Sequence, residues 1–131
     1  MAALTLESRI QDLVRRDRRY QAEAYLFVFE ALDHVSQRSW RRALDARHVS
    51  VQQLLDGIRA LAMQEFGPLA RCVFESWGVY RTEDFGEIVF NLIHNNLLNQ
   101  SEDDDKKGFQ DGFSFRETFE QAYRPSLKIE P

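Results

Sequence analysis

The sequence predicts a mainly α-helical, single-domain protein over residues 1–131. Its C-terminal half is winged-helix-like, with three helices followed by a short β-hairpin. Three observations support this prediction. Apolar residues recur at helical spacing along most of the chain. Capping residues, glycines and prolines mark several helix ends. The hydrophobic fraction of 44%, with ten Phe, four Tyr and two Trp, supplies enough apolar surface for a packed core.

The first half of the chain contains two predicted helices. Residues 1–19 form an arginine-rich helix with loosely spaced apolar residues, and we expect it to lie at the periphery of the domain. Residues 23–35 are apolar on nearly all sides and rich in Ala, Leu and Glu, which favour helices. A helix of this kind usually has others packed around it, so we predict that it is the central core helix. Residues 38–48 are basic and are predicted to form a loop or a short helix.

The next two helices have clear boundaries in the sequence. Ser50 and Gln53 have the spacing of a capping box, in which each side chain bonds to the backbone amide of the other residue. Gly67 lies where a helix end favours a left-handed residue, and Pro68 suits the first turn of the helix that follows. Gly78 is predicted to end that second helix.

The third helix of the winged-helix-like unit is predicted over residues 82–98, which have the most regular amphipathic spacing in the chain. Thr82 is its predicted N-cap. Gly86 is an unfavourable residue inside a helix. Close approach of another helix, for which residues 68–77 are the candidate, would explain why a glycine is present there. Close approach of a partner's backbone would explain it as well.

The end of the chain is predicted to contain a β-hairpin wing within residues 97–115. Residues 109–115 alternate imperfectly between apolar and polar residues, and they are the predicted second strand. Ser114 and Glu117 have the spacing expected at the start of a short closing helix. Residues 124–131 have no core pattern and are predicted to be a frayed tail.

Charges are distributed unevenly along the chain, whose net charge is −4. Nine basic and seven acidic residues precede Val51, whereas eight basic and fourteen acidic residues follow from that point. This asymmetry indicates two different surfaces, or a protein that pairs with itself or with a charged partner.

The candidate partner surface is the outer face of the predicted helix at residues 82–98. Its polar residues are Glu83, Asp84, Glu87, Asn91 and Asn95. Together with the acidic run at residues 102–105, these carboxylates would repel nucleic-acid phosphates. DNA reading through this helix and wing is therefore disfavoured. Two alternatives remain, namely an acidic face that is simply solvated and a surface that binds a basic partner.

The candidate basic patch comes mainly from the first half of the chain. Its residues are Arg15, Arg16, Arg18, Arg19, Arg38, Trp40, Arg41 and Arg42. The functional interpretation is a patch that contacts RNA phosphates while Trp40 stacks on a base. The structural interpretation is a set of solvated helix ends with Trp40 packed against the core, and this is the one that we favour.

The sequence contains no pattern typical of a catalytic, metal or cofactor site. His34, His48 and His94 lack metal-ligand spacing, and the single cysteine cannot complete a zinc site with them on sequence evidence. Cys72 lies between apolar neighbours and is predicted to be a small core residue. We also find no phosphate-binding glycine loop and no nucleophile elbow. We therefore predict no cofactor and no enzymatic activity, although residues that meet only in three dimensions would escape this argument.

Cysteine usage and hydropathy give the expected compartment. One cysteine cannot form an intramolecular disulfide, and no apolar leader follows the N-terminus. The longest apolar run falls far short of the roughly 20 residues that a membrane-spanning helix needs. We therefore expect a soluble, cytoplasmic protein.

Three stretches of the chain, residues 47–59, 65–71 and 75–93, have a recognisable pattern. Its most specific part is Ser76-Trp77-Gly78 followed by Arg81-Thr82-Glu83-Asp84-Phe85-Gly86. In these residues the chain resembles a family of small uncharacterised bacterial proteins, known mainly from planctomycetes and verrucomicrobia. The resemblance covers residues 20–123 and implies a bacterial cytoplasmic protein, without any functional residue to carry over.

Arg81 lies within the most specific part of this resemblance. It is expected either to form a buried ion pair with Asp84 or Glu75 or to take part in binding, with the ion pair slightly favoured.

The function predicted from the sequence is that of a non-catalytic adaptor or regulatory domain. It would bind another protein, or itself, through the acidic face of residues 82–98 and the wing. The first alternative is an RNA-associated or ribosome-associated protein that uses the arginine clusters. The second alternative is an enzyme whose site is not recognisable in the sequence.

Overall fold

The structure is a computed structural model, and it describes residues 5–38, 50–98 and 106–121. The helices are α1 (Leu6–Arg16), α2 (Ala22–Arg38), α3 (Val51–Glu65), α4 (Ala70–Ser76) and α5 (Thr82–His94). Three short helical turns complete the list: η2 (Gly67–Leu69), η3 (Lys106–Phe109) and η4 (Arg116–Gln121). The prediction of a mainly helical protein is confirmed. None of the helices within the described ranges is long and apolar enough to cross a membrane.

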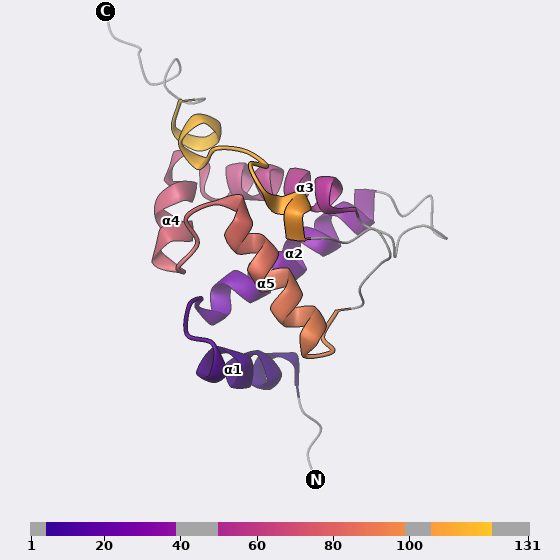
Figure 1. Ribbon diagram of the computed structural model, residues 1–131. Helices are drawn as coiled ribbons and strands as arrows, with labels where there is room; N and C mark the ends of the chain where they lie inside the picture. The colour runs from indigo at the N-terminus through magenta and orange to yellow at the C-terminus, as the bar shows by residue number, and fades with distance from the viewer. Residues whose placement is uncertain (1–4, 39–49, 99–105, 122–131) are drawn as a thin grey trace, which may run out of the picture.

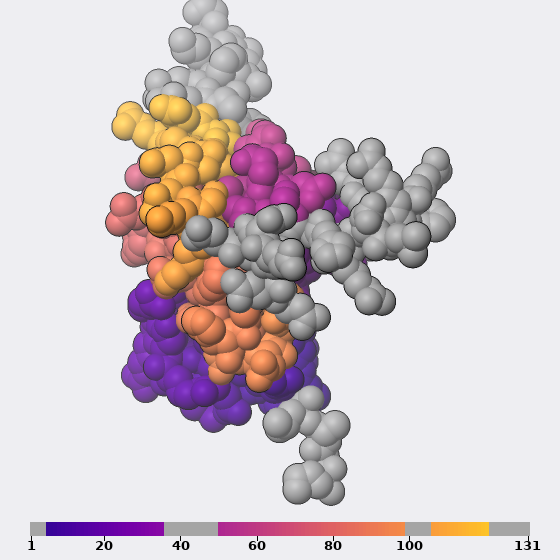
Figure 2. Space-filling model, turned by 45° about the vertical axis from the view of Figure 1, so that its right-hand side comes forward, coloured from indigo at the N-terminus to yellow at the C-terminus, as the bar shows by residue number. Residues whose placement is uncertain are grey.

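The helices pack around α2, as the sequence predicts. Helix α2 contacts α1, α3 and α5, and α5 crosses it on the near side in Figure 1. The turn η3 packs against α5 and α3, while η4 packs against η2 and α4. In Figure 2 the C-terminal segment, coloured orange to yellow, accordingly lies beside α3. Helix α1 is not merely peripheral, because Ile10 and Leu13 are buried in the common core.

An aromatic cluster occupies the centre of this core. Phe74 of α4 is fully buried, and its ring centroid lies 5.5 Å from that of Phe27 in α2 and 5.2 Å from that of Phe85 in α5. It also lies 5.1 Å from the ring of Phe115 and 5.7 Å from that of Phe119. One side chain therefore connects α2, α4 and α5 to the C-terminal segment.

The local capping signals of the sequence are largely confirmed. The amide of Gln53 donates to Ser50 Oγ over 3.1 Å, and the amide of Ser50 donates to Gln53 Oε1 over 2.9 Å, which completes the capping box. Gly67 and Gly78 have φ values of +56° and +92°, in the left-handed region that helix ends favour. The amide of Glu117 donates to Ser114 Oγ, so Ser114 caps the closing turn η4, which has π-helical geometry.

The predicted N-cap of α5 is wrong. Thr82 is the first residue of the helix, and Arg81 is the N-cap. The Asp84 carboxylate supplies the capping bonds, because it accepts the amides of Tyr80 over 2.8 Å and of Arg81 over 3.3 Å. The Thr82 side chain is 1% exposed and turns toward the interior.

The predicted β-hairpin wing is also wrong. Among the described parts of the 97–115 stretch, residues 97–98 and 106–115, no strand is present. Residues 106–109 instead form η3, and Asp111 turns the chain with a φ of +50°. The physical reason is that Phe109 and Phe115 are both buried and pack in different places, Phe109 against α5 and Phe115 against Phe74. The chain between them turns to reach both places.

Another helical element does approach Gly86, as predicted, but it is η3 and not the helix at residues 68–77. A Cβ on Gly86 would lie 3.0 Å from atoms of the buried Phe109 side chain. The glycine therefore makes room for a ring from η3, and the preceding helix α4 is not the neighbour that requires it.

The prediction that Cys72 is a core residue is wrong as well, since it is exposed. It lies two residues from each of the buried Ala70 and Phe74, and this spacing places it on the opposite face of a helix.

We predict that Phe74→Ala lowers the free energy of unfolding by about 3–5 kcal/mol, because it leaves a cavity where four segments meet. Phe90→Ala is the matched control, since Phe90 lies on the neighbouring helix α5 and is only partly buried. Its loss is expected to be less than half as large. Urea unfolding followed by circular dichroism gives both values, and equal losses at the two positions would contradict the central role of Phe74.

Candidate functional site

The predicted partner surface on α5 lies against the turn between α1 and α2. We call Glu83, Asp84, Glu87, Asn91 and Asn95 the polar face of α5. Asn91 Nδ2 donates to Asp17 Oδ2 and to the Tyr25 hydroxyl, each over 3.0 Å. The middle of the polar face is therefore bonded within the chain.

The residues at either end of the polar face have internal partners too. The hydroxyl of Tyr20, which is 3% exposed, donates to Asp84 Oδ1 over 2.8 Å. Burial, followed by this bond to a carboxylate, raises the pKa of Tyr20 and keeps its phenol neutral. At the other end of α5, a guanidinium nitrogen of Arg16 donates to Asn95 Oδ1 over 2.9 Å.

Arg19 brings the predicted basic patch to the polar face. It forms an ion pair with Asp17 at 2.8 Å and a longer one with Glu87 at 3.5 Å. Lys106 also pairs with Glu87, at 3.3 Å. Two oppositely charged surfaces that the sequence leaves separate thus meet inside one molecule.

The rest of the predicted basic patch is not gathered at this contact. Arg15 forms an exposed ion pair with Asp12 on its own helix, and Arg18 is exposed. The side chain of Arg38 and all of Trp40, Arg41 and Arg42 lie outside the described residues.

Gly78 allows the loop before α5 to approach this turn closely. A Cβ on Gly78 would collide with the carbonyl oxygen of Arg19, and its φ of +92° is unfavourable for other residues. Beside it, the amide of Gln21 donates to the Trp77 carbonyl over 3.0 Å. The chain between α4 and α5 is therefore fixed on the side of the α1–α2 turn.

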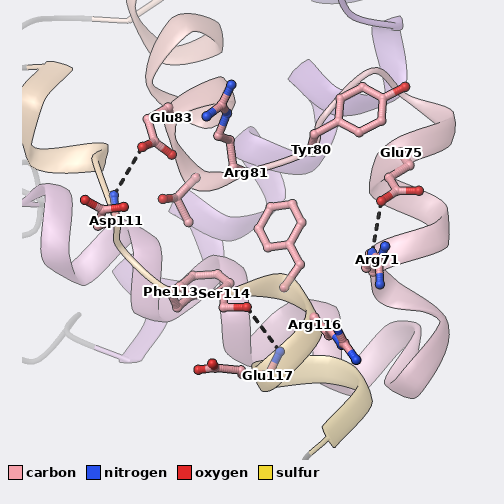
Figure 3. A pocket seen from close by; sticks show the side chains of 12 residues that line it. Arg71, Glu75, Tyr80, Arg81, Glu83, Asp111, Phe113, Ser114, Arg116 and Glu117 are labelled. Carbon is pink, nitrogen blue, oxygen red and sulfur yellow. Dashed lines mark hydrogen bonds and ion pairs between the residues drawn. The ribbon is translucent and has the colours of Figure 1, made fainter.

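A cleft of about 600 Å³ lies near the N-terminal end of α5, and we call it the charged cleft. It is lined by Arg71, Glu75, Tyr80, Arg81, Thr82, Glu83, Asp111, Phe113, Ser114, Phe115, Arg116 and Glu117. Figure 3 shows residues 80–83 along one edge and residues 113–117 along the other, with Arg71 and Glu75 at one end and Asp111 at the opposite end.

The hydroxyl of Thr82 joins the edge at residues 80–83 to the segment that leads into the other edge. This hydroxyl donates to the Phe109 carbonyl over 2.6 Å and accepts the amide of Gly112 over 3.0 Å. The amide of Asp111 points at Glu83 Oε2 over 3.4 Å. A buried Phe115 lies below, in ring contact with Phe74. The shape of the cleft is therefore set mainly by buried contacts, with one further bond from the Asp111 amide to the Glu83 carboxylate.

The charges of the cleft differ in how they are paired. Arg71 bonds to Glu75 over 3.0 Å and to Glu120 over 3.1 Å, and these carboxylates raise the pKa of Arg71. Arg81 and Arg116 are both exposed, and neither forms an ion pair with any residue that the structure describes. The predicted pair of Arg81 with Asp84 or Glu75 does not form there, since Asp84 caps α5 and Glu75 binds Arg71.

The cleft itself was missed by sequence reasoning. Its edges lie about thirty residues apart in the sequence, and Thr82 joins them through side-chain bonds to residues 109 and 112. The available signals were the run of residues 76–86 that mixes polar and apolar side chains and the aromatic residues at 109–119. Neither signal indicates that these two segments meet.

Comparisons of the chain with protein-family models, with curated proteins and with solved structures gave no match. The resemblance to small bacterial proteins therefore stays a prediction. Among the described residues, no group of three or more His, Cys, Asp or Glu side chains is arranged to hold a metal ion. The site is thus interpreted from its own geometry.

We predict that Thr82→Val destabilises the protein by about 1–3 kcal/mol, because the Phe109 carbonyl and the Gly112 amide lose a buried partner. Thr82→Ser keeps the hydroxyl and is expected to lose less. Urea unfolding measures the stability of each variant. Hydrogen exchange measures the exchange rate of the Gly112 amide, which should rise in the valine variant alone. Equal exchange in both variants would show that the hydroxyl does not join the edges.

We also predict a pH-dependent contribution from Asp17. Bonds from Arg19, and then from Asn91, lower the pKa of Asp17 from 3.8 to about 2. The unfolded chain therefore binds this proton first as pH falls, so the contribution of Asp17 is complete above pH ~4 and is lost as pH drops through ~2. At neutral pH, Asp17→Asn should cost on the order of 1 kcal/mol, because Asp17 is partly exposed and water screens the pair.

The control for this prediction is Asp12→Asn, since Asp12 forms only an exposed pair with Arg15. Chemical unfolding at several pH values between 2 and 7 compares both variants with the wild type. A deficit for Asp17→Asn that persists unchanged at pH 2 would rule out the carboxylate as its cause.

Proposed function

We propose that the protein is a non-catalytic interaction domain that binds a segment of another protein in the charged cleft. The observation that carries the proposal is a cleft with edges fixed by buried contacts and with Arg81, Arg116 and Tyr80 presented to solvent. Tyr80 is 63% exposed. Tyrosine and arginine are enriched at protein interfaces, where they provide contact area and directional hydrogen bonds.

This proposal keeps the function predicted from the sequence but moves the contact along α5. Asp84, Asn91 and Asn95 already bond within the chain, so they have less capacity left for a partner. Glu83 belongs to both surfaces, because it lies on the polar face of α5 and also lines the cleft. Light scattering distinguishes another protein from a second copy of the chain as the source of the bound segment. A cytoplasmic location is part of the proposal.

The RNA-associated alternative has less support. Arg16 and Arg19 are bonded to side chains of α5 and the α1–α2 turn, and phosphate binding would have to compete with these acceptors. In addition, Glu83, Asp111 and Glu117 would repel a polyanion at the cleft.

The lowered pKa of the Asp17 carboxyl group gives little support to the enzyme alternative. This lowering reflects an ion pair, which favours a structural role over proton transfer at neutral pH.

The proposal is tested by photo-crosslinking from the cleft. A benzophenone amino acid at position 80 should capture a partner protein in cells of the source organism. The same group at Gln64, which is exposed on α3, should capture far less. The crosslinked species is identified by mass spectrometry, and light scattering of the purified protein tests self-association. A strict monomer with equal capture from both positions would contradict the proposal.

A further inference from the structure

We infer that the segment bound in the charged cleft carries both signs of charge, with a carboxylate facing Arg81 and Arg116 and a cation facing Glu83, Asp111 and Glu117. This inference rests on the proposed function and specifies the partner's chemistry. Seven of the residues that line the charged cleft are themselves charged: Arg71, Glu75, Arg81, Glu83, Asp111, Arg116 and Glu117.

Both signs of charge are present along the cleft. In Figure 3 the carboxylates of Glu83, Asp111 and Glu117 lie toward one end. Arg116 lies toward the other end, whereas Arg81 lies on the opposite edge, beside Glu83. A segment that occupies the whole cleft therefore meets both carboxylates and guanidinium groups.

Internal pairing determines which of these charges are available. Arg71 is paired with both Glu75 and Glu120, so the end of the cleft that they form has no unpaired cation. Arg81 and Arg116 have no ion-pair partner in the described parts of the chain, and the same holds there for the side chains of Asp111 and Glu117. Both an uncompensated cationic region and an uncompensated anionic region thus remain.

A partner with only one sign of charge fits this arrangement poorly. A polyanion such as RNA gains contacts with Arg81 and Arg116 but brings its phosphates against three carboxylates. A polybasic peptide meets the converse repulsion from the two guanidinium groups. Specificity of this kind depends as much on repulsion of the wrong partner as on attraction of the right one.

Tyr80 and the size of the cleft are suited to a peptide that carries these charges. Its ring is largely exposed beside Arg81, and an exposed aromatic ring can stack on an aromatic side chain or receive a cation over its face. The cleft volume of about 600 Å³ lies within the usual range for bound ligands and accommodates a few residues of an extended chain. We therefore assign the cleft to a short segment of a protein partner.

A selection from a displayed library of random twelve-residue peptides tests the inference. The enriched peptides should contain both an acidic and a basic residue within a short window. Each is then measured by fluorescence anisotropy against the wild type, the double variant Arg81→Glu/Arg116→Glu and the control Arg59→Glu. Arg59 is exposed on α3, away from the cleft lining.

We expect the double variant to bind at least tenfold more weakly and the control to bind as the wild type does. Both reversed residues are exposed, so thermal unfolding should be little changed, and this measurement separates lost binding from lost folding. Single-sign peptides, or a twelve-nucleotide single-stranded RNA, should not compete with the enriched peptides. Enrichment of single-sign peptides, effective competition by RNA, binding that survives the double reversal or no enrichment at all would each overturn the inference.

Failure of this inference is distinguishable from failure of the proposed function. A partner captured from position 80 whose contacting segment has a single sign of charge would leave the interaction domain in place and refute the assigned chemistry. Absence of both capture and peptide binding would refute the two together.

Discussion

The packing of aromatic rings around Phe74 is the constraint on which the rest of the structure depends. Helix α4 is short, and a helix of this length is not stable by itself. It is held because Phe74 contacts rings from α2, from α5 and from the segment that ends in η4. The same contacts place residues 113–117 opposite residues 80–83. The charged cleft therefore exists because an apolar cluster below it fixes two segments that are distant in the sequence. The Arg71–Glu120 ion pair and the bond from the Asp111 amide to Glu83 add polar contacts between residues 71–83 and the C-terminal segment.

A second, polar constraint sets the edges of the cleft. Thr82 has lost the capping role that its position suggested, and its buried hydroxyl instead satisfies one carbonyl and one amide of the C-terminal segment. The Asp84 carboxylate takes over the capping and also accepts the hydrogen bond from Tyr20. Each polar group near the start of α5 thus has a structural partner, and Arg81 and Tyr80, which lie just before the helix, are left for binding. The proposed function rests on this difference between residues that are bonded within the fold and residues that are exposed.

The sequence predicted those parts of the fold that depend on contacts between neighbours. The Ser50–Gln53 capping box, the left-handed glycines and the apolar α2 are each determined within a few residues, and all are confirmed. The errors share a different origin. The absent hairpin, the role of Thr82 and the reason for Gly86 all depend on where Phe109 packs, and Phe109 lies 27 residues after Thr82 in the sequence. Alternation of apolar residues suggested a strand, whereas the ring of Phe109 packs against α5 and the ring of Phe115 packs against Phe74. The cleft depends on the same contact between α5 and the segment that contains Phe109. The sequence therefore indicated its individual residues but not the fact that they meet.

The charge asymmetry of the chain has a structural explanation that changes its functional meaning. Its basic front and acidic rear suggested surfaces for external partners, but Arg16 and Arg19 bond to the polar face of α5 and to Asp17. Part of the asymmetry is therefore complementarity within the molecule. A sum of charges along the sequence does not distinguish charges that are paired internally from those that remain available. In this structure the distinction is local, because Glu87 and Arg19 are paired whereas Arg81 and Arg116 form no ion pair with any described residue. The candidate partner surface is consequently defined by what the fold leaves unpaired, and this is the argument for placing it at the cleft.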